Sequence, residues 1–364
     1  VTSNEGATAS LPRAVALEPP ADPASAIAYL EAREGMRVVL PPSRVVAATN
    51  AHGVTYALPV ESGVDRLFRG GADSRLRGLA APGAWLALDH GAALPEVVGV
   101  LTHAYGEHRV LVGGGDPAPT AQPRPVPTAA PTPSREVLRV ATYNLHDHFD
   151  TVDDRDKEDP VRSADAYALQ TARRARSISA HLGAPDVLGV QEVENLAVLQ
   201  ALADHPALAA AGYRAMLLEE DVAGRPIGRD LRGIDVGFLY RAWRVQLVGL
   251  EQRPTCATDP DVVALLRDGA EQACVVGDVP GRWLFDRPPL VARFRVVATQ
   301  GRLVVINNHF RSMSGDDDTT PVRVAMAEHV RAIVDAEHAA DPSAALVVLG
   351  DLNAFEDGPV LATL

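Results

Sequence analysis

Short alternating runs of apolar and polar residues, separated by turn-forming residues, fill the first part of the chain. They predict strands over residues 36–40, 44–48, 54–60, 84–89, 97–102 and 109–112. Residues 102–107 are expected to form the hairpin connection between the last two strands. A small all-β barrel of five or six strands fits this pattern. No cluster of catalytic residue types stands out within it.

The second part of the chain alternates strands with helices. Apolar runs predict strands over residues 138–143, 187–190, 236–240, 291–297, 303–307 and 346–349. A helix is predicted over 166–182, with an apolar face formed by Leu169, Ala172, Ala175, Ile178 and Leu182, and another over 320–336. This alternation is typical of a layered α/β domain.

A proline-rich stretch separates the two parts. Seven of the 28 prolines fall between Asp116 and Ser134, and such a segment favours an extended, semi-rigid spacer. We therefore expect an all-β domain over 1–112, a linker over 113–135 and an α/β domain over 136–364.

Composition and charge narrow the class of protein. Hydrophobic residues make up 47% and charged residues 22% of the chain, and no apolar run approaches the roughly 18 residues that a membrane span needs. A membrane-spanning protein and a wholly disordered one are excluded. The formal net charge is −13, and residues 138–364 hold 23 Lys and Arg against 34 Asp and Glu. A polyanionic substrate would need metal ions or local arginine patches to bind.

Two features favour export from the cell. Cys256 and Cys274 lie 18 residues apart, and we expect a disulfide between them, with two unrelated buried thiols as the alternative. The first residues lack the pattern of a signal peptide, and Val1 is not a normal start. We expect that a leader was removed or that the chain was trimmed.

Polar side chains follow four of the predicted strands in the second part. Asn144, Glu192, His309 and Asp351 each come where an apolar run ends, and Asn353 follows shortly after. Any one of them alone is typical of a turn. Their joint occurrence, with this chemistry and in this order, indicates a site assembled at one edge of a sheet.

The surrounding segments carry a resemblance to a known family. Residues 142–145 (Thr-Tyr-Asn-Leu), 191–195 (Gln-Glu-Val-Glu-Asn), 307–310 (Asn-Asn-His-Phe) and 350–353 (Gly-Asp-Leu-Asn) resemble the signature of the endonuclease/exonuclease/phosphatase superfamily. Residues 232–241 and 285–290 resemble segments of its exported bacterial members, and the first part resembles the OB-like domain found ahead of some secreted nucleases. The resemblance implies a two-sheet, four-layer α/β sandwich that cleaves phosphate esters with a metal, preceded by a small OB-like barrel.

The resemblance also implies roles for the strand-end residues. Glu192 and Asn144 would hold Mg²⁺, with Mn²⁺ or Ca²⁺ as alternatives, and the metal would stabilise charge during in-line attack by water. His309 would transfer a proton or hydrogen-bond the phosphate, the alternative being a structural histidine. Asp351 would position or deprotonate the water, and Asn353 would donate its amide to a phosphate oxygen.

Other polar residues receive supporting roles. Arg287 is expected to meet a backbone phosphate, the alternative being an ion pair with its neighbour Asp286, and Asp235 is expected to support the site from an adjacent strand. The acidic run 153–159 is expected to be a solvated loop, with Ca²⁺ binding as the alternative. His146 and His148 are expected to line the substrate groove or to lie in the loop, with metal binding as the alternative, and the arginines Arg173, Arg174 and Arg176 are expected on an exposed helix face.

One part of the family pattern is missing. Family members carry a late Ser-Asp-His segment that completes the site, and nothing after Asn353 supplies it. We therefore expect that the chain is truncated at its C-terminus and that it turns over poorly as it stands.

These observations favour a secreted nuclease that acts on DNA or RNA, without a membrane span or an obligate protein partner. A phosphatase or lipid phosphodiesterase of the same superfamily is the first alternative, and an inactive binding module is the second.

Overall fold

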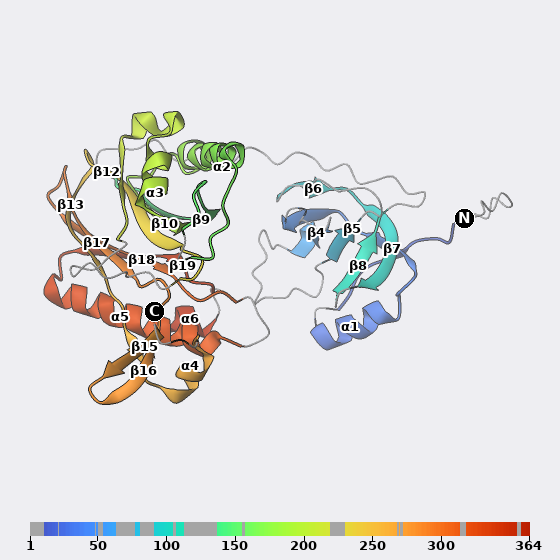
Figure 1. Cartoon of the computed structure of the whole chain (residues 1–364). Coiled ribbons are helices and arrows are strands. Elements are labelled where there is room, and N and C mark those ends of the chain that lie inside the picture. Colours follow the sequence, from blue (N-terminus) through green and yellow to red (C-terminus); the bar gives the residue numbers. More distant parts are fainter. Residues whose placement is uncertain are drawn as a thin grey trace. The chain divides into compact units, whose positions relative to one another are not determined.

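The computed structural model describes residues 11–20, 22–47, 49, 54–62, 77–80, 91–104, 107–112, 137–154, 157–218, 230–267, 269, 272–313, 318–354 and 358–364. The chain divides into two compact units, Val1–Val126 and Pro127–Leu364 (Figure 1). The predicted linker lies outside the described residues, so the expected domain boundaries stay a prediction. Among the described residues, no helix has both the length and the apolar character needed to cross a membrane.

The first unit contains one eight-stranded sheet in the order β1-β2-β7-β8-β5-β4-β3-β6. Its elements are β1 (Val15–Ala16), α1 (Pro23–Glu31), β2 (Arg37–Leu40), β3 (Ser43–Ala47), β4 (Val54–Pro59), the 3₁₀ turn η1 (Val60–Ser62), β5 (Arg77–Ala80), β6 (Ala93–Leu94), β7 (Val97–Ala104) and β8 (Glu107–Leu111). Helix α1 begins after Asp22, whose carboxylate accepts the Ser25 N–H at 2.8 Å.

This sheet differs from the predicted barrel of five or six strands. In the described part of the unit, β1 and β6 stand at the two ends of the strand order and no pairing joins them, so a closed OB-like barrel is not shown. The additional strands β1, β5 and β6 have two to four residues each, which is too short for alternation to be visible. The strand expected over 84–89 lies outside the described residues.

The second unit is built on two four-stranded sheets, in the orders β11-β12-β10-β9 and β13-β17-β18-β19. The strands are β9 (Val140–His148), β10 (Val187–Val193), β11 (Tyr213–Met216), β12 (Asp235–Arg241), β13 (Val245–Gln252), β17 (Leu290–Val296), β18 (Arg302–His309) and β19 (Ala345–Asp351). The helical elements are α2 (Ala164–Arg176), the π-helical turn η2 (Ser177–His181), α3 (Leu196–Ala203), the 3₁₀ turn η3 (Pro206–Ala211), α4 (Pro260–Leu265), α5 (Thr320–Ala340) and α6 (Pro359–Thr363).

Three apolar layers hold this unit together. One lies between the two sheets and includes Val236, Phe238 and Phe294. The second joins α2 and α3 to the first sheet, and the third joins α5 to the second sheet. Figure 1 shows α2 and α3 on one side of the paired sheets and α5 on the other. The unit is therefore a mixed α/β sandwich with helix, sheet, sheet and helix in sequence, as predicted.

The predicted apolar face of α2 is confirmed in part. Ala175 and Ile178 are buried as expected, whereas Leu169 is 53% exposed. Arg174 is buried, so the expectation that it belongs to an exposed arginine face is wrong. Its side chain reaches into the unit and donates to backbone carbonyls of β9.

A buried polar bridge fixes the two sheets to each other. Asn307 on β18 donates from Nδ2 to the carbonyl oxygens of Val190 on β10 and Gly237 on β12, at 2.9 and 2.8 Å. Its Oδ1 accepts from Gln191 Nε2 at 2.6 Å. A Cβ at Gly189 would clash with Leu349 Cδ1 and would lie 3.1 Å from Asn307 Cγ, so glycine allows this close approach of the two sheets. The bridge sets the register between the ends of β10 and β18.

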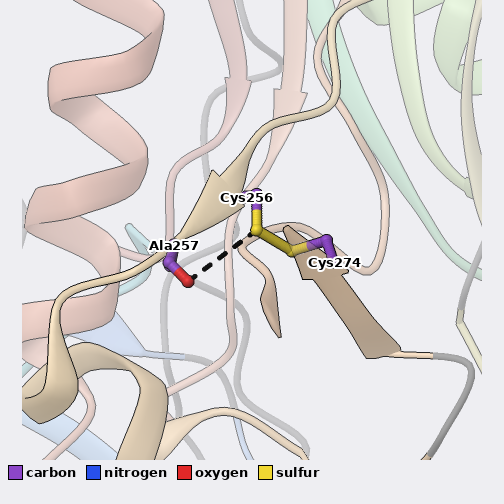
Figure 2. Close-up of a disulfide and its surroundings, with 3 residues drawn as sticks. All are labelled: Cys256, Ala257 and Cys274. Atoms are coloured by element: carbon purple, nitrogen blue, oxygen red, sulfur yellow. Dashed lines mark hydrogen bonds between the residues drawn. A yellow bond between two sulfur atoms is a disulfide. The ribbon is translucent and has the colours of Figure 1, made fainter. Parts of the chain in front are cut away.

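The predicted disulfide is present. It joins Cys256 on β14 (Cys256–Ala257) to Cys274 on β15 (Ala273–Val276), within a small sheet completed by β16 (Val279–Trp283) (Figure 2). Gly281 of β16 pairs with Cys274, and a Cβ there would lie 2.8 Å from Cys256 Sγ. In the chain-entropy model, closing a loop of this length stabilises the fold by about 3 kcal/mol.

Candidate functional site

The strand-end residues meet at one edge of the sandwich. Strand β9 runs parallel to β10, with Asn144 paired to Gln191, and β18 runs parallel to β19, with His309 paired to Asp351. Because the carboxyl ends of parallel strands share an edge, Asn144, Glu192, His309 and Asp351 are brought to the same place. The Asn307 bridge holds the ends of the two sheets together there.

The polar atoms of these residues converge. Asn144 Nδ2 donates to Glu192 Oε1 at 2.7 Å and to Asp351 Oδ2 at 2.9 Å. His309 Nε2 lies 3.6 Å from Glu192 Oε1. Candidate ligand atoms of Glu192, His309 and Asp351 all lie within 4.8 Å of one another. In this geometry Asn144 holds the two carboxylates through its NH₂ group, while its Oδ1 accepts the His146 N–H.

The donor set fits a divalent cation. Glu192 and Asp351 offer hard carboxylate oxygens, the ligands that Mg²⁺ prefers. Two further carboxylates, Asp147 and Asp230, pair with two arginines at the rim. These two guanidinium charges offset two of the four carboxylate charges, which leaves a formal charge of −2. A divalent cation between Glu192 and Asp351 would neutralise the site.

Asn353 supports Asp351 in this structure. Its backbone N–H donates to Asp351 Oδ1 at 3.0 Å, and its Nδ2 donates to the Phe310 carbonyl at 3.1 Å. The first contact lies within the turn after β19, and the second fixes that turn to the residue that follows β18. The predicted contact between the Asn353 amide and a phosphate oxygen stays a prediction.

His309 is held as a neutral imidazole. It is 5% exposed, and burial together with the charges of Arg287 and Arg232 lowers its pKa to about 2. Its Nδ1 is buried and has no hydrogen-bond partner among the described residues. Its other ring nitrogen, Nε2, faces Glu192.

Two ion pairs that the sequence did not indicate border this group. Arg287, from the loop before β17, donates from Nη1 to Asp230 Oδ2, and both side chains are buried. Its sequence neighbour Asp286 pairs with Arg267 instead, at 3.6 Å. Arg232 donates from Nη2 to Asp147 Oδ1. The partners in these pairs are 57 and 85 residues apart, so spacing could not reveal them.

A strained bulge presents Glu192. Between the pairs Gln191–Asn144 and Val193–His148, Glu192 stands opposite three residues of β9, and it has a φ of 59°. His146 and Asp147 also have positive φ, 55° and 58°, which costs about 1–3 kcal/mol per residue. Asp147 N–H donates to Glu192 Oε2 at 2.9 Å. The strained conformation therefore orients the carboxylate of Glu192, the candidate metal ligand.

Arg174 supports this bulge from α2. Its Nε donates to the Leu145 carbonyl at 2.6 Å and its Nη2 to the His146 carbonyl at 2.8 Å. Burial lowers the pKa of Arg174 to about 10, so it remains charged near neutral pH. The spacing of Thr171, Arg174, Ala175 and Ile178 was the available signal, because these positions share one helix face.

Asp235 lies beside the site, in the wall of a separate cavity. It pairs with Val193 across β10 and β12. The cavity, of about 710 Å³, is also lined by Asp154, Lys157, Glu194, Asn195 and Asp230. Burial raises the pKa of Glu194 to about 7. A supporting role for Asp235 stays a prediction.

The two histidines of the bulge separate. His146 lies in the left-handed bulge, whereas the His148 ring is fully buried against Tyr167, with ring centroids 5.6 Å apart. Among the described residues, neither ring nitrogen of His148 has a hydrogen-bond partner. The Gln170 side chain raises the pKa of His148, but by less than burial lowers it. Burial and the Arg174 charge lower the pKa of His148 to about 3.

Acid is expected to destabilise the second unit through His148. The folded protein favours the neutral ring of His148. In the unfolded chain this residue binds a proton below its ordinary pKa of 6.5, whereas in the folded protein its pKa is about 3. This contribution to stability is complete above about pH 6.5 and is lost as the pH falls, by about 1.4 kcal/mol per unit. Urea denaturation between pH 4 and 7 should show that the free energy of unfolding depends less steeply on pH in His148→Phe than in wild type. The exposed His181→Phe serves as the control, and equal slopes for wild type and His148→Phe would contradict the prediction.

Comparison with known proteins adds a family match. A model described as "Endonuclease/Exonuclease/phosphatase family" matches residues 139–268. This range includes Asn144 and Glu192, whereas His309 and Asp351 lie beyond it. No curated protein matches the sequence.

Several solved structures resemble the chain at low identity. An endonuclease/exonuclease/phosphatase family protein from Bacteroides thetaiotaomicron has a TM-score of 0.39 and 16% identity, covering 62% of this chain and 67% of that one. A mannosyl-6-phosphatase from the same organism has the same TM-score and identity, covering 62% and 69%. The human Nocturnin catalytic domain has a TM-score of 0.35 and 14% identity, covering 53% and 59%. The family match over residues 139–268 is what supports the endonuclease/exonuclease/phosphatase superfamily for the second unit.

Proposed function

We propose that the second unit is a metal-dependent phosphodiesterase that acts as a secreted nuclease on DNA or RNA. The observation that carries this proposal is the convergence of Glu192, His309 and Asp351 within 4.8 Å at one sheet edge. Glu192 and Asp351 would hold Mg²⁺, with Mn²⁺ or Ca²⁺ as alternatives, and Asn144 keeps their carboxylates together. The cation supplies stabilisation of the negative charge that develops on the phosphoryl group.

The remaining side chains position the reacting groups through hydrogen bonds. Asp351 is held through both oxygens, by Asn144 and by the Asn353 N–H, and in this position it would orient an attacking water. In the tautomer that carries its single proton on Nδ1, the neutral His309 would donate a hydrogen bond to a phosphate oxygen, because Nδ1 has no partner among the described residues. These side chains are held in place before the substrate binds, so the site can stabilise the transition state without rearranging its polar groups.

Arg287 is suited to the phosphate that is cleaved. It is buried, and in the part of the chain that the structure describes its Nε–H has no hydrogen-bond partner. An unsatisfied buried donor is costly, and a phosphate oxygen would satisfy it. The charge of Arg287 also lowers the pKa of His309, which supports a role for Arg287 near the same phosphate. The Cys256–Cys274 disulfide supports export, because such bonds persist mainly in oxidising compartments.

Incubating the protein with supercoiled plasmid and with single-stranded RNA, in Mg²⁺ and in EDTA, tests this function. Because no Ser-Asp-His segment follows Asn353, we expect slow cleavage in Mg²⁺, none in EDTA and none by Asp351→Ala. Asp335→Ala, which removes an exposed aspartate from α5, is the matched control and should retain activity. Hydrolysis of a small phosphate monoester without nucleic-acid cleavage would replace the nuclease by a phosphatase, and inactivity on all substrates would favour a binding module.

A further inference from the structure

The rim of the site carries a second arginine whose function the nuclease proposal leaves open. Arg232 lies three residues before β12, and its side chain is 48% exposed while that of its partner Asp147 is 26% exposed. Exposed ion pairs of this kind contribute about 0–1 kcal/mol to stability. The fold therefore has little need of the Arg232 charge at this position.

Two chains of hydrogen bonds connect Arg232 to the site. Its guanidinium donates to Asp147 Oδ1, and the Asp147 N–H donates to Glu192 Oε2 at 2.9 Å. Its backbone N–H donates to Asp230 Oδ1 at 2.9 Å, while Asp230 Oδ2 accepts from Arg287. Asp230 thus fixes the main chain of Arg232 and the side chain of Arg287 on one carboxylate. The spacing between the two arginines is set by this shared support.

The two arginines differ in what they can still bind. Arg287 is buried and held by Asp230, which suits a single phosphate at the reacting position. Arg232 is half-exposed, and the Asp147 contact uses one of the five N–H donors of its guanidinium. Asp147 joins it to Glu192 through hydrogen bonds, so it is connected to the same centre while open to solvent. A fork of free donors at the rim matches the oxygens of a second phosphate.

We propose that Arg232 binds the phosphate adjacent to the one that is cleaved, and that it thereby makes the site prefer a polynucleotide to an isolated phosphate ester. This inference rests on the proposed nuclease function. The chain has a net charge of −13 and so does not attract a polyanion at long range. Binding of a polynucleotide therefore requires local cationic contacts, and Arg232 would provide one. A substrate with a single phosphate would not reach Arg232 and would not depend on it.

The test compares one substrate with many phosphates and one with a single phosphodiester. The substrates are a labelled single-stranded DNA 12-mer and bis(4-nitrophenyl) phosphate, and the variants are Arg232→Gln and Arg232→Lys. Arg302→Gln is the matched control, because Arg302 is 68% exposed, pairs with an aspartate and begins β18, at the end opposite His309. Binding of the 12-mer in EDTA, followed by fluorescence anisotropy, gives a readout without turnover.

We expect Arg232→Gln to raise KM and Kd for the 12-mer about 10-fold and to change kcat/KM for the single diester less than about 2-fold. The dependence of log Kd on log salt should become shallower by about 0.7, the contribution of one phosphate contact on a single strand. Arg232→Lys should recover part of the affinity, and Arg302→Gln should behave as wild type.

Two results would overturn the inference while leaving the nuclease function intact. The first is an Arg232→Gln variant that matches Arg302→Gln on both substrates. The second is an equal loss on both substrates, which would mean that Arg232 acts through Asp147 on Glu192 instead of on a second phosphate. A wild-type protein that does not cleave the 12-mer would remove the nuclease proposal and this inference together.

Discussion

Replacing Glu192 with glutamine is expected to lower kcat/KM for a phosphodiester by about 10³-fold. The carboxylate accepts Asn144 Nδ2 at one oxygen and the Asp147 N–H at the other. Glutamine can accept at one oxygen only, so its NH₂ group would face another donor. The substitution also removes one of the negative charges that would hold the cation. Steady-state kinetics with Mg²⁺, together with calorimetric titration of Mg²⁺, measure the two effects.

Glu328→Gln is the matched control for this experiment. Glu328 is exposed on α5, so the same chemical change there should leave both kcat/KM and Mg²⁺ affinity unaltered. Retention of Mg²⁺-dependent turnover within about tenfold of wild type by Glu192→Gln would show that the cation is held elsewhere.

Replacing Asn307 with leucine is expected to lower the free energy of unfolding of the second unit by about 4 kcal/mol. The change leaves the Val190 and Gly237 carbonyls and the Gln191 amide without their partner in the interior, and each unsatisfied buried group costs about 1–3 kcal/mol. Activity should fall as well, because Asn307 sets the register of the strands that carry Glu192 and His309. Urea denaturation followed by circular dichroism measures the stability.

Gln246→Leu provides the comparison, since it makes a similar amide-to-leucine change at an exposed position of β13. Its effect should stay within about 0.5 kcal/mol. A loss of less than about 1 kcal/mol in Asn307→Leu would mean that the sheets repack around the leucine and that the polar bridge does not fix their register.

The sequence predicted the elements with strong apolar runs and missed those that are short or half-exposed. The buried strands β10, β12 and β18 follow from continuous apolar residues, which mark a strand covered on both faces. Strand β13 (Val245–Gln252) was not predicted, because it is an edge strand with a register shift near Gly249 and no clear alternation. Strand β5 has four residues, Arg-Gly-Leu-Ala, and carries too little pattern for any prediction.

The site was predictable to the extent that strand ends fix position. Asn144, Glu192, His309 and Asp351 follow apolar runs, so strand direction alone brings them to one edge. The contacts of Arg232 and Arg287 depend instead on loops whose path no spacing rule describes. The positive φ of Glu192 was also hidden, because only the tertiary structure can hold a non-glycine residue in that conformation.

Because Arg174 contacts the bulge, three neighbouring arginines of α2 differ in how well they tolerate substitution. Arg173 and Arg176 are exposed, so lysine or glutamine should replace either at little cost. Position 174 requires a planar fork whose Nε–H and Nη–H reach two successive carbonyl oxygens, and the single ammonium group of lysine cannot reproduce that geometry. Residues of one type in one helix turn are thus under different constraints, and the stricter one follows from the conformation of a strand nearly 30 positions earlier in the chain.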